Sequence, residues 1–167
     1  PILHESITFN GKPSNITGRL EHKLGDVEAG FAEADIVIER SFRTEPVHQG
    51  YIESHACLVS VAPDGKSTVW SSSQGQFMVR AMCAHLAGLP QSDIRAIPAE
   101  IGGGFGGKTI VYLEPLALLL SRKSGRPVKM VMSREEVFRA TGPTSGSKST
   151  VKIGATKDGR IVAAQGT

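Results

Sequence analysis

Several kinds of residue are scarce in this chain, and their scarcity excludes whole classes of protein. Only Cys57 and Cys83 are cysteines, and no C-x-x-C or Cys/His spacing suggests a metal site. Aromatic residues make up 5% of the chain, and its lysines and arginines are scattered, although the formal net charge is +3. Nucleic-acid binding needs basic clusters interleaved with stacking aromatics, so we expect none here.

Long apolar runs are also absent. No stretch reaches the length that spans a membrane, and no signal peptide opens the chain, so we expect a cytoplasmic protein with two free, buried thiols and no membrane partner. A content of 40% hydrophobic and 21% charged residues is ordinary for a soluble globular domain. The chain opens at Pro1 without an initiator methionine and closes directly after a strand-like run. It therefore reads as a segment of a longer polypeptide.

The pattern along the chain changes near residue 25. Residues 1–25 are rich in Asn, Gly, Ser and Pro without a steady period, which predicts a linker or extended arm. Beyond them, cap residues, glycine stops and apolar periodicity predict helices over 26–34, 76–87 and 112–123 and a short one from Glu135. Alternating runs and Asp-Gly turns predict strands over 36–42, 56–61, 67–72, 93–97, 127–132, 151–155 and 160–164.

The order of these elements predicts the fold class. From residue 56 it is β-β-α-β-α-β plus a trailing hairpin. Strands separated by helices of ten to twelve residues favour parallel crossovers, and the hairpin adds antiparallel pairing. We expect an α+β fold of two layers, a mixed sheet with helices packed on one face.

One segment is unusually rich in glycine. Residues 101–108 place five glycines around Phe105, between a strand-like and a helix-like run. Each glycine costs roughly 0.5–1 kcal/mol in backbone entropy but allows positive φ and close approach of the backbone. This pattern indicates a loop whose N–H groups contact a ligand.

The same segment also matches a nucleotide-binding motif. Gly102 to Thr109 fits G-x-x-x-x-G-K-[ST], so a P-loop domain is the alternative. Three features argue against it. The strand at 127–132 is followed by Ser133 and not by a magnesium-binding acid, Phe105 is bulky for a phosphate cradle, and Pro115 lies beyond the first turn of the predicted helix.

Three pieces in order carry a family resemblance. These are the run Trp70–Phe77 with Gln74 inside it, Gly88-Leu-Pro90, and the glycine-rich Ile101–Lys108. Together they resemble the molybdenum-binding large subunit of the xanthine dehydrogenase and aldehyde oxidase family. Gly25–Phe31 and Tyr51–Ala56 resemble earlier parts of the same subunit, so residues 26–167 are identified as part of its first molybdopterin-binding domain.

The resemblance implies a molybdenum hydroxylase. Such an enzyme oxidises an aldehyde, an aromatic heterocycle or a related carbon centre with water-derived oxygen. Its cofactor is molybdopterin carrying molybdenum, in bacteria usually as the cytosine dinucleotide. Electrons leave through 2Fe-2S clusters to FAD on other domains or subunits, and further molybdopterin domains of the same polypeptide complete the site. The segment alone is expected to be inactive.

The resemblance also implies site residues. Gln74 donates a hydrogen bond to a molybdenum ligand without adding charge, while Gly104, Phe105 and Gly106 contact the cofactor. None of these residues is expected to ligate the metal directly, and the general base lies outside this chain.

The resemblance and the sequence pattern also draw attention to Glu53, His55, Lys108 and Thr109. Lys108 either lines the substrate pocket or closes the loop, and Thr109 is assigned to the substrate pocket. Thr109 stands where purine-oxidising relatives carry a glutamate, which puts a purine substrate in doubt. Glu53 and His55 form either an acid/base pair or buried structural hydrogen bonds, and the second is favoured because they lie two apart on an expected strand.

Overall fold

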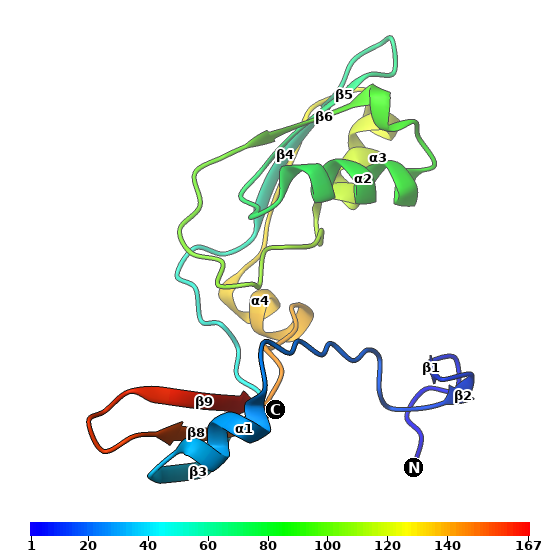
Figure 1. Cartoon of the computed structure of the whole chain (residues 1–167). Helices are drawn as coiled ribbons and strands as arrows, with labels where there is room; N and C mark the ends of the chain where they lie inside the picture. The colour runs from blue at the N-terminus through cyan, green and yellow to red at the C-terminus, as the bar shows by residue number, and fades with distance from the viewer. The chain divides into compact units, whose positions relative to one another are not determined.

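The computed structural model describes all 167 residues and divides them into two compact units. One unit comprises residues 1–42 and 148–167, and the other comprises residues 43–147 (Figure 1). Each unit has its own sheet. None of the helices has the length and apolar character that a membrane span needs.

The unit of residues 43–147 is built on a four-stranded mixed sheet. Its strands lie in the order β6-β5-β4-β7. They are β4 (Ala56–Val61), β5 (Ser67–Ser71), β6 (Ile94–Pro98) and β7 (Val128–Val131). β5 pairs with β6 in parallel, whereas β4 is antiparallel to both β5 and β7. The β4–β5 hairpin turns at Gly65, whose φ of 87° is a conformation that glycine adopts without steric cost.

Two helices cover one face of this sheet (Figure 1). They are α2 (Gln76–Ala87) and α3 (Glu114–Ser124), and each ends at a left-handed glycine, Gly88 or Gly125. Between helices and sheet lies the core, with fully buried side chains that include Val59, Val69, Val79, Cys83, Ala117 and Leu118. Burial of side chains of this size stabilises the unit by roughly 1.5–3 kcal/mol each.

A short helix packs at the end of the sheet that carries the glycine-rich loop. α4 (Arg134–Ala140) begins with a capping box between Ser133 and Glu136. Its Val137 joins Met132 and Tyr51 in a second buried cluster. A single 3-10 turn, Gln91–Asp93, precedes β6.

The other unit contains the three-stranded sheet β3-β8-β9. Its strands are β3 (Ile36–Thr44), β8 (Ser147–Ala155) and β9 (Ile161–Gly166), and α1 (Val27–Glu33) packs against β9. Asp26 caps α1 by accepting from the N–H groups of Glu28 and Ala29. The small hairpin of β1 (Thr8–Phe9) and β2 (Lys12–Pro13) lies further towards the N-terminus.

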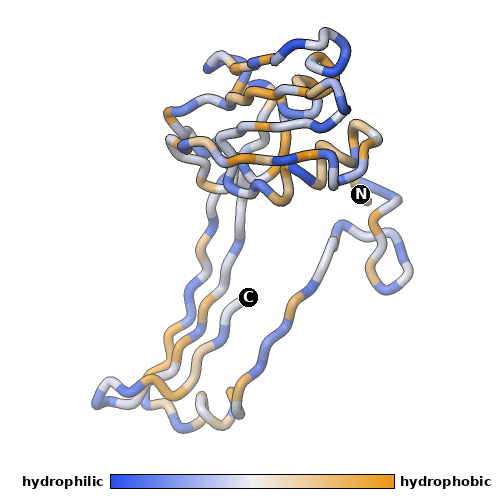
Figure 2. Tube along the Cα trace, turned by 90° about the horizontal axis from the view of Figure 1, so that it is seen from above, coloured by the Kyte–Doolittle hydropathy of each residue, from blue (hydrophilic) through white to orange (hydrophobic).

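The fold class is α+β as expected, with three differences in detail. β7 runs in the same direction as β6, as a crossover through α3 predicts, but it lies at the opposite edge of the sheet and pairs antiparallel with β4 instead of lying beside β6. The C-terminal hairpin pairs with β3 in a separate sheet. Residues 1–25 contain a short hairpin around Asn10 and Gly11, both at positive φ, while the stretch that follows carries mostly hydrophilic residues (Figure 2).

Helix α3 also starts later than its sequence pattern predicts. It begins at Glu114 and not at Tyr112, because the N–H of Tyr112 donates to the Glu114 side chain (3.0 Å). Pro115 therefore lies within the first turn, where proline is well tolerated. The position of Pro115 is thus no argument against a P-loop, and that alternative has to be judged on the loop itself.

Candidate functional site

The glycine loop, residues 102–107, lies on side chains that require the absence of Cβ atoms. A Cβ on Gly102 would lie 2.7 Å from Glu53, one on Gly104 2.5 Å from Gln74, and one on Gly107 2.6 Å from Tyr51. Real Cβ contacts do not occur at such distances. These three glycines therefore serve close packing of the loop on the protein, which corrects the expectation that the glycines mainly admit a ligand.

Gly106 differs from these three glycines. Its φ is +89° and no atom lies within 4 Å of where its Cβ would be. The preceding Phe105 also has a positive φ, 49°, and the residue is 72% exposed. A phenylalanine in this backbone conformation is uncommon. The Cα of Gly106 and the side chain of Phe105 are thus the parts of the loop that are open to a ligand.

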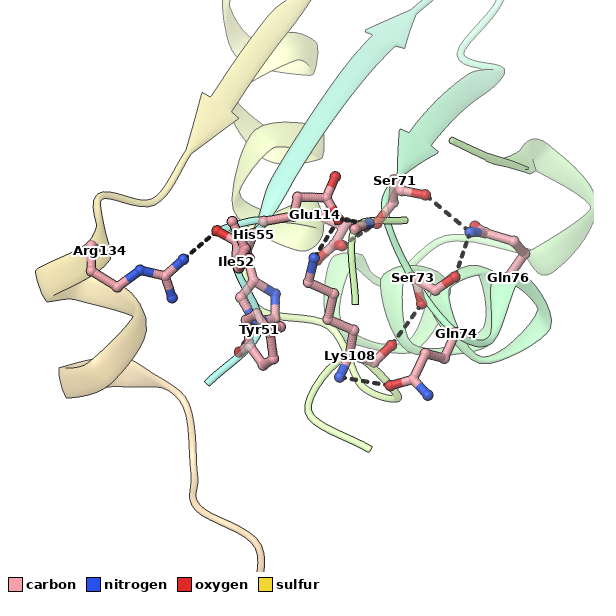
Figure 3. Close-up of polar contacts among 12 residues, drawn as sticks. Tyr51, Ile52, His55, Ser71, Ser73, Gln74, Gln76, Lys108, Glu114 and Arg134 are labelled. Carbon is pink, nitrogen blue, oxygen red and sulfur yellow. Dashed lines mark hydrogen bonds and ion pairs between the residues drawn. The ribbon is translucent and has the colours of Figure 1, made fainter. Parts of the chain in front are cut away.

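Gln74 holds the peptide between Phe105 and Gly106 from the side. Its Oε1 accepts hydrogen bonds from the N–H groups of Gly106 (3.0 Å) and Lys108 (3.2 Å). Two donors at one oxygen fix the orientation of the amide, so the Nε2 donor points away from the loop (Figure 3). The predicted role of Gln74 as a neutral donor is therefore compatible with its geometry.

The same contact changes which backbone groups are available. The N–H of Gly106 is already used by Gln74, so it does not face a ligand as the sequence suggested. The N–H groups of Gly104 and Phe105 have no hydrogen-bond partner within the chain. The N–H of Gly103 is unpaired as well, and of these three residues Phe105 is exposed whereas Gly104 is buried.

Lys108 and Thr109 both act in closing the loop. Lys108 is buried, with 1% of its side chain exposed, and its Nζ lies 2.6 Å from Oε2 of Glu53. The hydroxyl of Thr109 donates to the carbonyl of Gly106 (3.1 Å). Of the two interpretations of Lys108, loop closure is the one that this geometry supports.

Glu53 and His55 do not contact each other as an acid/base pair. Glu53 binds Lys108 and the N–H of Gly102 (2.7 Å), whereas His55 Nε2 lies 2.7 Å from the hydroxyl of Tyr51. Each side chain makes a structural hydrogen bond, as favoured, but with a different partner. Residues 51–55 precede β4 and form no strand of their own.

Tyr51 is a residue whose importance the sequence did not reveal. It is fully buried beneath the loop, and its atoms lie against Gly103 and Gly107. The centre of its ring lies 5.0 Å from the ammonium of Lys108. Its hydroxyl also approaches Thr141 (3.3 Å). The available signal was the place of Tyr51 in the segment Tyr51–Ala56, which resembles a part of the same family subunit.

The His55 imidazole is held in its neutral form. Burial, and after it the nearby charge of Lys108, lowers the pKa of His55 below its usual value. The hydrogen-bond network of His55 and Tyr51 continues at Thr141. The hydroxyl of Thr141 donates to the carbonyl of Val137 (2.6 Å) and lies 2.9 Å from Nε2 of His48. The floor of the site is therefore a connected polar network and not an apolar surface.

A buried acid lies next to the loop. Glu114, at the start of α3, accepts hydrogen bonds from the hydroxyl of Ser71 (2.5 Å) and the N–H of Tyr112 (3.0 Å). Its side chain ties the end of β5 to the segment after the loop (Figure 3). Glu114 therefore links the segment just before Gln74 to the segment just after the glycine loop.

An open groove of about 680 Å³ begins at Gln74. It runs between the start of α2 and the edge strand β6. Its walls are formed by Gln74, Gly75, Gln76, Phe77, Arg80, Ile94, Arg95, Ala96 and Pro98. A volume of this size admits a ligand of drug size or larger.

The structure does not support a P-loop. In that motif the lysine is free to reach phosphates and the helix starts directly after it. Here Lys108 is buried against Glu53, and α3 begins only at Glu114. The nucleotide-binding interpretation of Gly102–Thr109 is therefore wrong.

Direct metal ligation by this chain is not indicated. No group of three or more His, Cys, Asp or Glu side chains could hold a metal ion. Both cysteines are free and buried, as predicted. What the site offers is an exposed aromatic ring, an oriented amide donor, free backbone N–H groups and a glycine with open space. This set fits an organic cofactor that brings its own metal.

Comparison with known proteins supports that interpretation. Residues 8–167 match the model of a molybdopterin cofactor-binding domain. The chain is 38% identical over 143 residues to the nicotinate dehydrogenase large molybdopterin subunit of Eubacterium barkeri, covering 86% of this chain and 34% of that protein. It is 36% identical over 149 residues to a protein of Escherichia coli K12 named probable hypoxanthine oxidase, covering 89% and 16%.

Solved structures agree with the sequence matches. The aldehyde oxidoreductase of Desulfovibrio desulfuricans superposes with a TM-score of 0.75 at 26% identity, covering 94% of this chain and 18% of that one. The chain thus spans only a part of the relatives it matches. It belongs to the molybdopterin cofactor-binding domain family of the xanthine dehydrogenase, aldehyde oxidoreductase and carbon monoxide dehydrogenase large subunits.

Proposed function

We propose that this chain forms one wall of the molybdenum site in a hydroxylase that oxidises an aldehyde, an aromatic heterocycle or a related carbon centre. The observation that carries the proposal is the pairing of Gln74 with Gly106. The loop fixes the amide so that a neutral donor stands beside Gly106, the glycine of the loop with free space at its Cβ position. When bound, the molybdopterin cofactor supplies the metal centre at which water-derived oxygen and the substrate carbon react.

The residues of this chain bind and orient in that scheme. Gln74 Nε2 donates a hydrogen bond towards the cofactor's metal ligands, and the N–H groups of Gly104 and Phe105 offer two more donors. A neutral amide and backbone N–H groups stabilise negative charge without competing for the metal. The exposed ring of Phe105 shields the same region from water, which strengthens each of these hydrogen bonds.

Other parts of the enzyme complete the proposal. We infer a molybdopterin in the cytosine dinucleotide form, held mainly by further molybdopterin domains of the same polypeptide. Electrons leave to 2Fe-2S clusters and FAD on other domains or subunits, and the general base comes from outside residues 1–167. Two relatives are named for nicotinate and for hypoxanthine, and their names support an aromatic heterocycle as the substrate class. Thr109 stands where the resemblance places a glutamate in purine-oxidising relatives, so we infer a substrate other than a purine; its hydroxyl donates to Gly106 instead.

The proposal is tested on the parent enzyme. Elemental analysis should give molybdenum close to one per chain, and the absorbance spectrum should show iron–sulfur and flavin bands. Turnover should then be assayed with aldehydes, pyridine carboxylates and purines. A full-length protein from molybdate-replete cells that carries no molybdenum would contradict the proposal.

A further inference from the structure

We propose that Glu53 is a positioning residue for the site: together with Lys108 it locks the glycine loop, and through the loop it sets the positions of Gln74 and Phe105. This inference rests on the proposed function for its purpose. The contacts that carry it lie entirely within residues 51–108 and do not depend on the cofactor.

One carboxylate oxygen ties together both ends of the loop. Oε2 of Glu53 accepts from the N–H of Gly102 at 2.7 Å and from the ammonium of Lys108 at 2.6 Å. The backbone N–H of Glu53 donates in turn to the carbonyl of Gly102 (3.3 Å). Gly102, at the start of the loop, and Lys108, directly after it, are thus both held by Oε2 of Glu53.

The burial of Lys108 makes this pairing specific. Its side chain is 1% exposed, while that of Glu53 is 31% exposed. The ammonium has the carboxylate of Glu53 and the ring of Tyr51 as its neighbours, and no other acidic side chain forms an ion pair with it. Without Glu53 the charge of Lys108 would be buried and unpaired, whereas without Lys108 the carboxylate could still be hydrated.

The effect passes from Lys108 to Gln74 through the backbone. The carbonyl of Lys108 accepts from the N–H of Gln74 (2.9 Å) and from the hydroxyl of Ser73 (3.1 Å), and its N–H donates to Gln74 Oε1 (3.2 Å). A shift of Lys108 must therefore displace the turn that carries Gln74. The same shift loosens Gly106, which shares the Gln74 oxygen.

Two variants separate this role from a general effect on folding. Glu53→Gln keeps the size of the side chain and an acceptor for Gly102, but it leaves the ammonium of Lys108 uncompensated. Adding Lys108→Met removes that charge while it keeps the length and the packing of the chain. If the pair positions the loop through charge, the double variant should be better ordered than the single one. Glu100→Gln, a change at an exposed acid close to the loop, is the matched control.

The measurement is amide hydrogen exchange of the molybdenum-free parent enzyme, read by mass spectrometry on peptides that cover residues 101–110. Glu53→Gln should speed exchange of this segment by at least about tenfold, the equivalent of one lost charged hydrogen bond. Exchange in α2 should stay unchanged. The double variant should exchange more slowly than Glu53→Gln, since it leaves no buried charge unpaired, but still at least about threefold faster than the wild type, since it lacks the ion pair. Glu100→Gln should have no effect.

Two results would overturn the inference: a loop in Glu53→Gln that exchanges like the Glu100→Gln control, or a double variant at least as unprotected as the single one. Should Glu53→Gln fail to fold, the double variant alone decides, because a loop that exchanges like the wild type without the ion pair would overturn the inference. Molybdenum analysis of the wild-type enzyme is independent of this test. Absence of molybdenum would overturn the proposed function and leave the exchange result to judge Glu53.

Discussion

Gln74 and Lys108 are joined by two hydrogen bonds that run in opposite directions. The backbone N–H of Gln74 donates to the carbonyl of Lys108 (2.9 Å), and the N–H of Lys108 donates to the side-chain oxygen of Gln74 (3.2 Å). The residue that presents the amide and the residue that ends the glycine loop therefore move as one piece. This coupling explains why a side chain that is itself exposed has a defined orientation.

Substitutions at Gln74 should separate its two roles. Gln74→Ala removes both the loop contact and the free donor, while Gln74→Glu keeps an acceptor for Gly106 and Lys108 but has no donor. In the parent enzyme both variants should lower kcat per bound molybdenum by about tenfold to a hundredfold, because one hydrogen bond to a charged acceptor is worth roughly 1.5–3 kcal/mol. Steady-state kinetics normalised to molybdenum content give the answer.

The control for this series is Gln165→Glu, which makes the same chemical change on an exposed residue of β9. It should leave kcat unchanged. Wild-type kinetics in Gln74→Glu with full molybdenum content would show that the amide only stabilises a turn.

The glycines of the loop offer a steric test. Gly104 has a backbone conformation open to any residue, yet a Cβ there would lie 2.5 Å from Oε1 of Gln74. Gly104→Ala should therefore push Gln74 aside and reduce turnover as strongly as Gln74→Ala. Gly142→Ala is the matched control, since it has no positive φ and no atom within 4 Å. Equal activity of the two alanine variants would contradict this account of the loop.

The sequence indicated which segments form the candidate site, because that choice depends on residue type and order. The oriented Gln74, the exposed Phe105 and the open Gly106 all lie in the two segments that carried the family resemblance. The supporting contacts were not predictable, because they join Glu53 and Tyr51 to residues about fifty positions later. A single sequence shows that five glycines are present, but not that three of them pack against side chains.

The fold shows the same division between local and long-range information. Helix α2 follows its apolar period and stops at Gly88, as local cap chemistry predicts. The pairing of β7 with β4 depends on where the chain returns after α3, and no local signal encodes that choice. Helix α3 begins two residues late because the side chain of Glu114 takes the N–H of Tyr112, a competition that periodicity does not detect.

The two thiols should be inert in the folded protein. Burial, together with the charge of Glu114, raises the pKa of both Cys57 and Cys83 from 9.0 to about 12. Iodoacetamide at pH 8 should therefore alkylate neither residue until the protein is denatured, as counted by mass spectrometry. Ser92→Cys places a thiol on an exposed position and should be alkylated at once. Native-state alkylation of Cys57 or Cys83 at a comparable rate would contradict their burial.

The stability of the unit of residues 43–147 should fall at mildly acidic pH because of His55. Its pKa is lowered by burial and by the charge of Lys108, so the unfolded chain binds a proton near pH 6.5 while the folded chain still excludes it. Below about pH 6.5 the unfolded state therefore holds more protons, and the free energy of unfolding decreases as pH falls. Above that pH both states are neutral and His55 adds no pH dependence.

Urea denaturation of the 167-residue chain can measure this, because its single tryptophan, Trp70 in β5, reports on the unit that contains His55. We expect the unfolding midpoint to be lower at pH 5.5 than at pH 7.5. His55→Gln retains one hydrogen bond to Tyr51 but cannot take up a proton, so it should flatten this difference. His85→Gln, at an exposed position on α2, should leave the difference unchanged. An acid sensitivity that survives His55→Gln would assign the effect to another group.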